Sequence, residues 1–62
     1  MKPGTLVEVT YVDEWDKAAG VRLGDVGLIN VAEHGKQIVL AQMLRVGRSY
    51  WLTHDQIREV TT

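Results

Sequence analysis

The sequence contains no cysteine, a single proline and no long hydrophobic run. Without cysteine, neither a disulfide framework nor a thiolate metal site can form. No apolar stretch approaches the roughly 20 residues that cross a bilayer, and the first residues lack the hydrophobic core of a signal peptide. We therefore expect no membrane segment, and the cytoplasm is the default location.

The chain also lacks an excess of either charge. Seven Lys and Arg residues stand against eight Asp and Glu residues, so the formal net charge is −1 and the isoelectric point is near 6.0. Nucleic-acid-binding proteins usually carry a basic excess, because contacts with phosphates supply most of their affinity. The overall balance argues against nucleic-acid binding, although it is compatible with a local basic face.

The length and the apolar pattern predict one small all-β domain over residues 1–62. Alternating apolar and polar residues, separated by glycine-bearing turns, indicate short strands and no long helix. We expect a tight hairpin at residues 33–36 and a bulge or bend at Gly27. The predicted strands are residues 6–12, 25–32, 37–43, 48–53 and 57–61.

Two of the connections between these strands carry further signals. Residues 13–24 form a long connection, which makes them a candidate for function. Thr53 and Gln56 form a Thr-x-x-Gln capping signal, and only one helical turn fits before Ile57 resumes the strand pattern. The residues expected in the core are Val7, Val9, Val26, Ile29, Val31, Ile38, Leu40, Leu52, Ile57 and Val60.

Two segments resemble parts of SH3-like barrels. Leu23-Gly24-Asp25-Val26 resembles the segment that ends the RT loop and opens the second strand. Residues 47–60 resemble the last third of such a barrel, in which a strand, a single 3₁₀ turn and a short final strand close the sheet. The resemblance implies a five-stranded SH3-like barrel with a long RT-type loop and one 3₁₀ turn before the last strand.

The best-known activity of SH3 domains is not expected here. Domains that bind proline-rich peptides place a tryptophan at the start of the third strand, and a proline and a tyrosine near the 3₁₀ turn. In this chain Gln37 and Ile38 open the third strand, and the turn carries Thr53 and Gln56. Because such peptides dock between aromatic walls, we do not expect this activity. Solitary SH3-like chains of this length are similar to small accessory proteins of bacteriophages and mobile elements.

The acidic connection supplies the first group of candidate partner-binding residues. Trp15 is surrounded by Asp13, Glu14 and Asp16. A tryptophan rimmed by charge has the anatomy of a binding hot spot, and the alternative is a tryptophan folded back over one end of the barrel. Tyr50 and Trp51 are the second candidates, since neighbours on a strand point to opposite faces and one of them is expected outside the core.

Three arginines are candidates for a nucleic-acid-binding patch. Arg22, Arg45 and Arg48 suit contacts with phosphates or with an acidic protein surface, and the alternative is a solvated face with salt bridges. The two histidines, His34 and His54, show no ligand pattern for a metal site. Ser49 lacks an evident base, and no phosphate-binding loop appears. We therefore expect no catalytic site, no metal and no cofactor.

These observations favour a non-enzymatic module that engages a protein partner through the acidic tryptophan loop and the exposed aromatic of the fourth strand. The acidic residues are expected to select a basic surface on that partner. One alternative is a KOW-like or Tudor-like module that binds nucleic acid in a transcription or ribosomal assembly, since residues 23–29 resemble the KOW core. Another alternative is an assembly subunit that associates with itself, for example as a homodimer.

Overall fold

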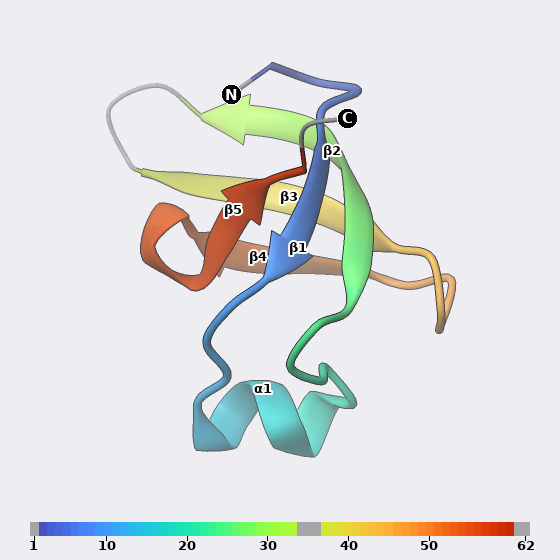
Figure 1. The fold of residues 1–62 in the computed structure, drawn as a ribbon, viewed down its shortest axis with the longest axis vertical. Helices are drawn as coiled ribbons and strands as arrows, with labels where there is room; N and C mark the ends of the chain where they lie inside the picture. Colours follow the sequence, from blue (N-terminus) through green and yellow to red (C-terminus); the bar gives the residue numbers. More distant parts are fainter. Residues whose placement is uncertain (1, 34–36, 61–62) are drawn as a thin grey trace.

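The computed structural model describes residues 2–33 and 37–60. The protein folds around one antiparallel sheet with a short helix at one end (Figure 1). Within these residues the sheet has five strands in the order β4-β3-β2-β1-β5, so β4 and β5 form its open edges. The all-β prediction is confirmed. The strands are β1 (Leu6–Val9), β2 (Val26–Glu33), β3 (Ile38–Met43), β4 (Ser49–Thr53) and β5 (Ile57–Glu59). The other elements are α1 (Glu14–Ala19) and the 3₁₀ turn His54–Gln56.

The long connection between β1 and β2 contains α1, a helix that the sequence pattern does not predict. The Asp13 carboxylate caps it by accepting a hydrogen bond from the Asp16 amide at 2.8 Å, and Gly20 ends it in the left-handed region with φ 98°. Six residues make fewer than two helical turns, which is too short to show a helical period. No helix in the described residues is long and apolar enough to cross a membrane.

The 3₁₀ turn between β4 and β5 lies where the capping signal predicts it. The Thr53 amide donates to Oε1 of Gln56 at 3.0 Å, so the Gln56 half of the predicted capping box is present. The Gln56 carbonyl also accepts the amides of Thr10 and Tyr11 at 2.7 and 3.3 Å. The turn is therefore attached to the chain that leaves β1. The predicted hairpin tip, residues 34–36, lies outside the described residues.

A bulge in β2 changes which of its residues face the core. Ile29 pairs with Ala41 and Val31 pairs with Leu40, so Asn30 is an extra residue without a partner in the ladder. Because side chains alternate along a strand, one extra residue moves those after it to the opposite face. Val31 is 41% exposed, and the prediction that it lies in the core is wrong. The bulge lies at Asn30, whereas the sequence pattern predicts a bulge or a bend at Gly27.

The core lies on the inner face of the sheet and differs from the predicted set mainly in β3. That strand is apolar on both faces, so its hydrophobicity does not reveal which set points inward. Five of the predicted core residues are buried, and the confirmed ones are Val7, Val9, Ile29, Leu52 and Ile57. The predicted residues that are only half-buried are Val26, Ile38, Leu40 and Val60. The buried apolar residues outside that set are Val39, Ala41 and Met43, together with Val21, which is expected to anchor the long connection to the core.

Gly27 is required because β3 passes very close to it. A Cβ atom at this position would lie 2.8 Å from the Gln42 carbonyl oxygen and 2.8 Å from the Met43 sulfur. The methionine side chain can move, but the Gln42 backbone is held in the ladder between β2 and β3. We expect Gly27→Ala to lower the free energy of unfolding by roughly 1–3 kcal/mol, measured by chemical denaturation.

The matched control for this variant is Gly47→Asn. Gly47 has φ 71° and open space around its Cβ position, and asparagine tolerates this backbone region better than other residues with a side chain. We expect this control to change stability much less than Gly27→Ala. Equal losses in the two variants would show that the contact with β3 is not the cause.

Candidate functional site

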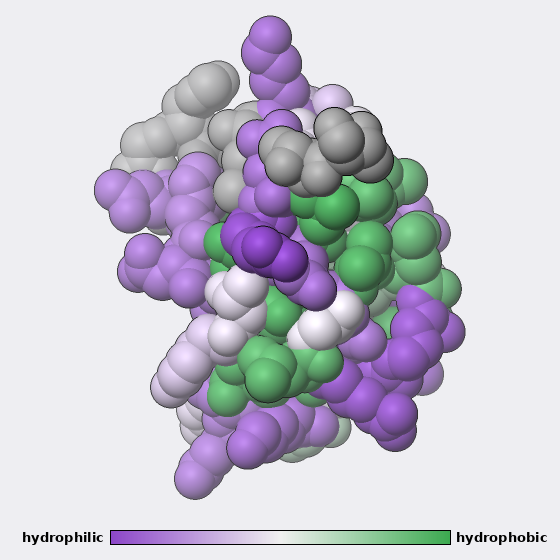
Figure 2. Space-filling model, viewed as in Figure 1, coloured by the Kyte–Doolittle hydropathy of each residue, from purple (hydrophilic) through white to green (hydrophobic). Residues whose placement is uncertain are grey.

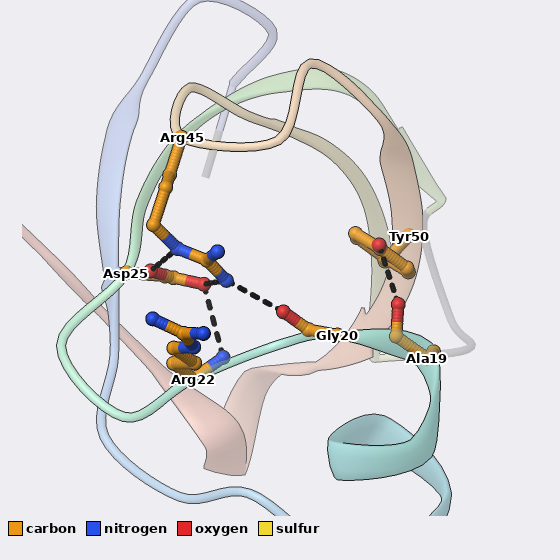
Figure 3. Close-up of polar contacts among 6 residues, drawn as sticks. All are labelled: Ala19, Gly20, Arg22, Asp25, Arg45 and Tyr50. Carbon is orange, nitrogen blue, oxygen red and sulfur yellow. Dashed lines mark hydrogen bonds and ion pairs between the residues drawn. The ribbon is translucent and has the colours of Figure 1, made fainter.

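Asp25 and Arg45 join the connection before β2 to the turn between β3 and β4 (Figure 3). Arg45 Nε donates to Asp25 Oδ1 at 2.8 Å, and Nη2 donates to Oδ2 at 2.9 Å. The same Nη2 donates to the Gly20 carbonyl at 2.6 Å, and the Arg22 amide donates to Asp25 Oδ2 at 2.9 Å. A two-pronged contact of this kind fixes the plane of the guanidinium, so a single carboxylate orients both segments.

The Asp25 carboxylate keeps its charge although the residue is only 8% exposed. Its hydrogen bonds from the Arg45 side chain lower the pKa of Asp25, and this effect outweighs burial, which acts in the opposite direction. The Arg22 amide lowers the pKa of Asp25 further. The same hydrogen bonds raise the pKa of Arg45, so both partners are charged at neutral pH.

The ion pair makes the stability of the fold depend on pH in the acidic range. Since the pKa of Asp25 in the folded protein lies below its usual value of 3.8, the pair contributes fully above that value. Its contribution is lost as the pH falls through the lower folded-state pKa. We expect Asp25→Asn to lower the melting temperature by roughly 5–15 °C at neutral pH, because an amide cannot accept all of these bonds.

The difference between the wild type and Asp25→Asn is expected to shrink as the pH falls below 3.8, since the carboxyl group of the unfolded chain then takes up a proton that the folded carboxylate binds only at lower pH. Thermal unfolding followed by circular dichroism over this pH range measures it. Glu59→Gln, which removes the same charge from an exposed residue of β5, is the control. A difference that stays constant with pH would contradict the assigned role of Asp25.

Side chains from β4 and the 3₁₀ turn hold α1 in place. The Tyr50 hydroxyl donates to the Ala19 carbonyl at 2.8 Å, at the end of the helix (Figure 3). Nearer its start, Asp16 accepts a hydrogen bond from Nε2 of the buried Gln56. The Tyr50 bond satisfies a carbonyl that a short helix leaves without an internal partner, and the Gln56 bond joins a side chain of α1 to the 3₁₀ turn. The helix is therefore positioned by the sheet rather than by its own length.

A pocket of about 570 Å³ lies beside this junction, between the end of α1 and the turn before β4. Four of the seven Lys and Arg residues of the chain line it, and no acidic residue of the described part does. The structure thus brings together the three arginines that the sequence suggests as a patch. It adds Lys17 and Tyr50, which no local signal connects with them. The charged residues of the lining are Lys17, Arg22, Arg45 and Arg48.

The acidic residues of the connection are partly engaged in bonds within the chain. Asp13 caps α1, and Asp16 binds Gln56. Glu14 and Trp15 lie exposed in the first turn of the helix, and Trp15 is 85% exposed. The alternative interpretation of Trp15 as a residue folded over one end of the sheet is therefore wrong. The acidic cluster exists, but two of its members serve the fold.

Tyr50 and Trp51 lie on opposite faces of β4, as the alternation predicts. Tyr50 is half-buried beside the pocket, whereas Trp51 is 51% exposed on the outer face. Trp51 is opposite Leu40 of β3, and Leu40 is opposite Val31 of β2. These three residues, which we call the apolar row, cross three adjacent strands. Sequence reasoning misses the row because Val31 reaches this face only through the bulge, and because Leu40 belongs to a strand that is apolar on both faces.

The remaining candidates form no site in the described part of the chain. His54 begins the 3₁₀ turn and Ser49 begins β4, while His34 lies outside the described residues. Residues 2–33 and 37–60 contain no group of three or more His, Asp or Glu residues placed to hold a metal ion. Neither a scan against protein-family models nor searches of curated proteins and of solved structures finds a match to this chain. The two surfaces that stand out by their geometry are the basic pocket and the apolar row.

Proposed function

We propose that the chain is a non-enzymatic binding module that engages a protein partner through the outer face of β2, β3 and β4. The observation that carries this proposal is the apolar row of Val31, Leu40 and Trp51. Directly opposed residues of antiparallel strands have Cβ atoms about 4.5–5.5 Å apart, so the three side chains form a continuous strip. Two of them are substantially exposed, and a partner that covers the strip removes apolar surface from water.

The charge distribution of the sheet supports this surface. Neither β3 nor β4 contains a charged residue, whereas the pair Glu8 and Arg58, 2.6 Å apart, links the neighbouring β1 and β5. Figure 2 shows hydrophobic residues gathered on the side of the molecule along which β2 runs. Depletion of charge and the presence of an aromatic residue distinguish the centre of an interface from the rest of a protein surface.

The position of β4 gives a partner a second means of attachment. β4 is an edge strand, so one side of its backbone carries no neighbouring strand in the described part of the chain. Extended segments of other proteins bind such edges by continuing the sheet. A segment added beside β4 would also lie next to Trp51. Backbone hydrogen bonds and contact with the apolar row would then act together.

We also propose that the scaffold is an SH3-like barrel. The five antiparallel strands, the long connection after β1 and the 3₁₀ turn before β5 support this assignment. Gln37 and Ile38 occupy the positions where proline-binding domains carry their tryptophan, so the partner is not expected to be a proline-rich peptide. A small accessory factor, of the kind encoded by bacteriophages and mobile elements, fits a chain of this size.

The exposed Trp15 is proposed as a secondary contact. It lies on α1, next to the exposed Glu14, and not on the strands of the apolar row. A partner with a basic region beside its apolar patch would be favoured by the acidic residues near this helix. The apolar row remains the primary contact, because it presents several apolar side chains together.

The test of the proposed function is the loss of binding in Trp51→Thr. Threonine retains a high preference for strands, so we expect the variant to fold. A partner is first captured from a lysate of the native host, and its affinity for the purified chain is then measured by isothermal titration calorimetry. We expect Trp51→Thr to weaken binding at least tenfold and Trp15→Ala to weaken it less.

Tyr11→Thr is the matched control, because Tyr11 is another exposed aromatic residue that lies outside the apolar row. It is expected to leave the affinity within about threefold of the wild type. Binding that survives Trp51→Thr, or that is lost equally in the control, would refute the proposal. Sedimentation over a range of concentrations examines self-association, and a dimer that dissociates in Trp51→Thr would make the partner a second copy of this chain.

A further inference from the structure

We propose that the pocket lined by Lys17, Arg22, Arg45 and Arg48 binds phosphate groups. This site is distinct from the surface of the proposed function. Tyr50 lines the pocket, whereas the adjacent Trp51 points to the opposite face of β4. The two sites can therefore be tested separately.

The concentration of positive charge at this pocket contrasts with the chain as a whole. The net charge is −1, yet four of the seven basic residues line one pocket. The ion pairs between described residues are Arg45 with Asp25 and Arg58 with Glu8, so Lys17, Arg22 and Arg48 have none there. Asp25 offsets only part of the repulsion among these like charges, and an anion in the pocket would relieve the remainder.

The wall of the pocket is held in place before any ligand arrives. Arg45 uses Nε and Nη2 to bind Asp25 and Gly20, and Nη1 has no hydrogen bond to a described residue. The Tyr50 hydroxyl is bound to the Ala19 carbonyl. A preformed wall lowers the entropy lost on binding, since fewer side chains become ordered. Only the exposed side chains of the lining need to adjust to the ligand.

The chemistry of the lining favours phosphate over carboxylate. Guanidinium groups donate in a planar fork that suits phosphate oxygens, and several cations around one pocket suit a group with more than one negative charge. A pocket of about 570 Å³ has the size of a small-ligand site, but its charged lining suits a polar ligand. The phosphates of a free nucleotide or polyphosphate and those of a nucleic-acid strand share this chemistry.

The experiment uses three probes: inorganic tripolyphosphate, a labelled single-stranded oligonucleotide and poly-glutamate. Binding is followed by fluorescence anisotropy and by competition at low salt. The pocket variant is Arg22→Gln with Arg48→Gln. The control is Lys2→Gln with Arg58→Gln, which changes the net charge equally at residues outside the pocket. We expect both phosphate probes to bind the wild type. Their affinity is expected to be at least tenfold lower in the pocket variant and within about threefold of the wild type in the control.

The salt dependence gives a second measure for the oligonucleotide. The three pocket cations that form no ion pair with a described residue predict a slope of about −2 for the logarithm of the association constant against that of the salt concentration. The slope is expected to become shallower, about −0.7, in the pocket variant, where one of these cations remains. Changes in the amide spectrum of the wild type, recorded by nuclear magnetic resonance, are expected at residues 17–22 and 45–50.

The outcomes distinguish the source of the phosphate. Displacement of the oligonucleotide by tripolyphosphate supports a small phosphorylated ligand, and resistance to displacement supports a nucleic-acid strand. The proposal is overturned if neither phosphate probe binds at low salt, if the control loses as much affinity as the pocket variant, or if spectral changes lie elsewhere. Binding of poly-glutamate as tight as that of phosphate also overturns it and points to an acidic protein. Trp51→Thr is expected to retain phosphate binding, so this proposal and the proposed function fail independently.

Discussion

The ion pair between Asp25 and Arg45 is the contact on which the geometry of the pocket depends. The Asp25 carboxylate orients Arg45 and accepts a hydrogen bond from the Arg22 amide. The Asp25 carbonyl accepts a hydrogen bond from the Val9 amide of β1 at 2.8 Å. One residue therefore connects β1, the connection that follows α1 and the turn between β3 and β4. The negative charge lies behind the pocket wall, so it offsets part of the repulsion among the basic side chains without occupying the pocket. The charge of Asp25 thus permits the basic cluster.

β4 separates two surfaces of different chemistry. Its inward side supplies Tyr50, which binds the end of α1 beside the basic pocket. Its outward side supplies Trp51, which belongs to the apolar row. The strict alternation of side chains along a strand makes this division possible within two adjacent residues. A chain with little room for separate domains can in this way present a basic pocket on one side of a strand and an apolar row on the other.

Local patterns in the sequence predict the strands and the 3₁₀ turn, because alternation and the Thr-x-x-Gln signal act between near neighbours. They do not predict α1, because this helix of fewer than two turns depends on hydrogen bonds from Tyr50 and Gln56. They also fail at Val31, since a bulge leaves no mark in the composition of a strand. The arginines of the pocket are identifiable as residue types, but their convergence depends on tertiary contacts. One local feature of the sequence marks Asp25: it is an acidic residue between a glycine and an apolar strand.

The bulge in β2 makes the exposed face depend on how the strand accommodates Asn30 as well as on its residues. If Asn30 were removed, Val31 would follow the inward-facing Ile29 directly, so Val31 would stay outward and Ala32 inward. If Asn30 were kept but paired in the ladder without a bulge, Val31 would turn inward, and the apolar row would lose a member without any change in its amino acids. Related chains could gain or lose this surface through the bulge alone, and comparing residue identities position by position would not reveal the change.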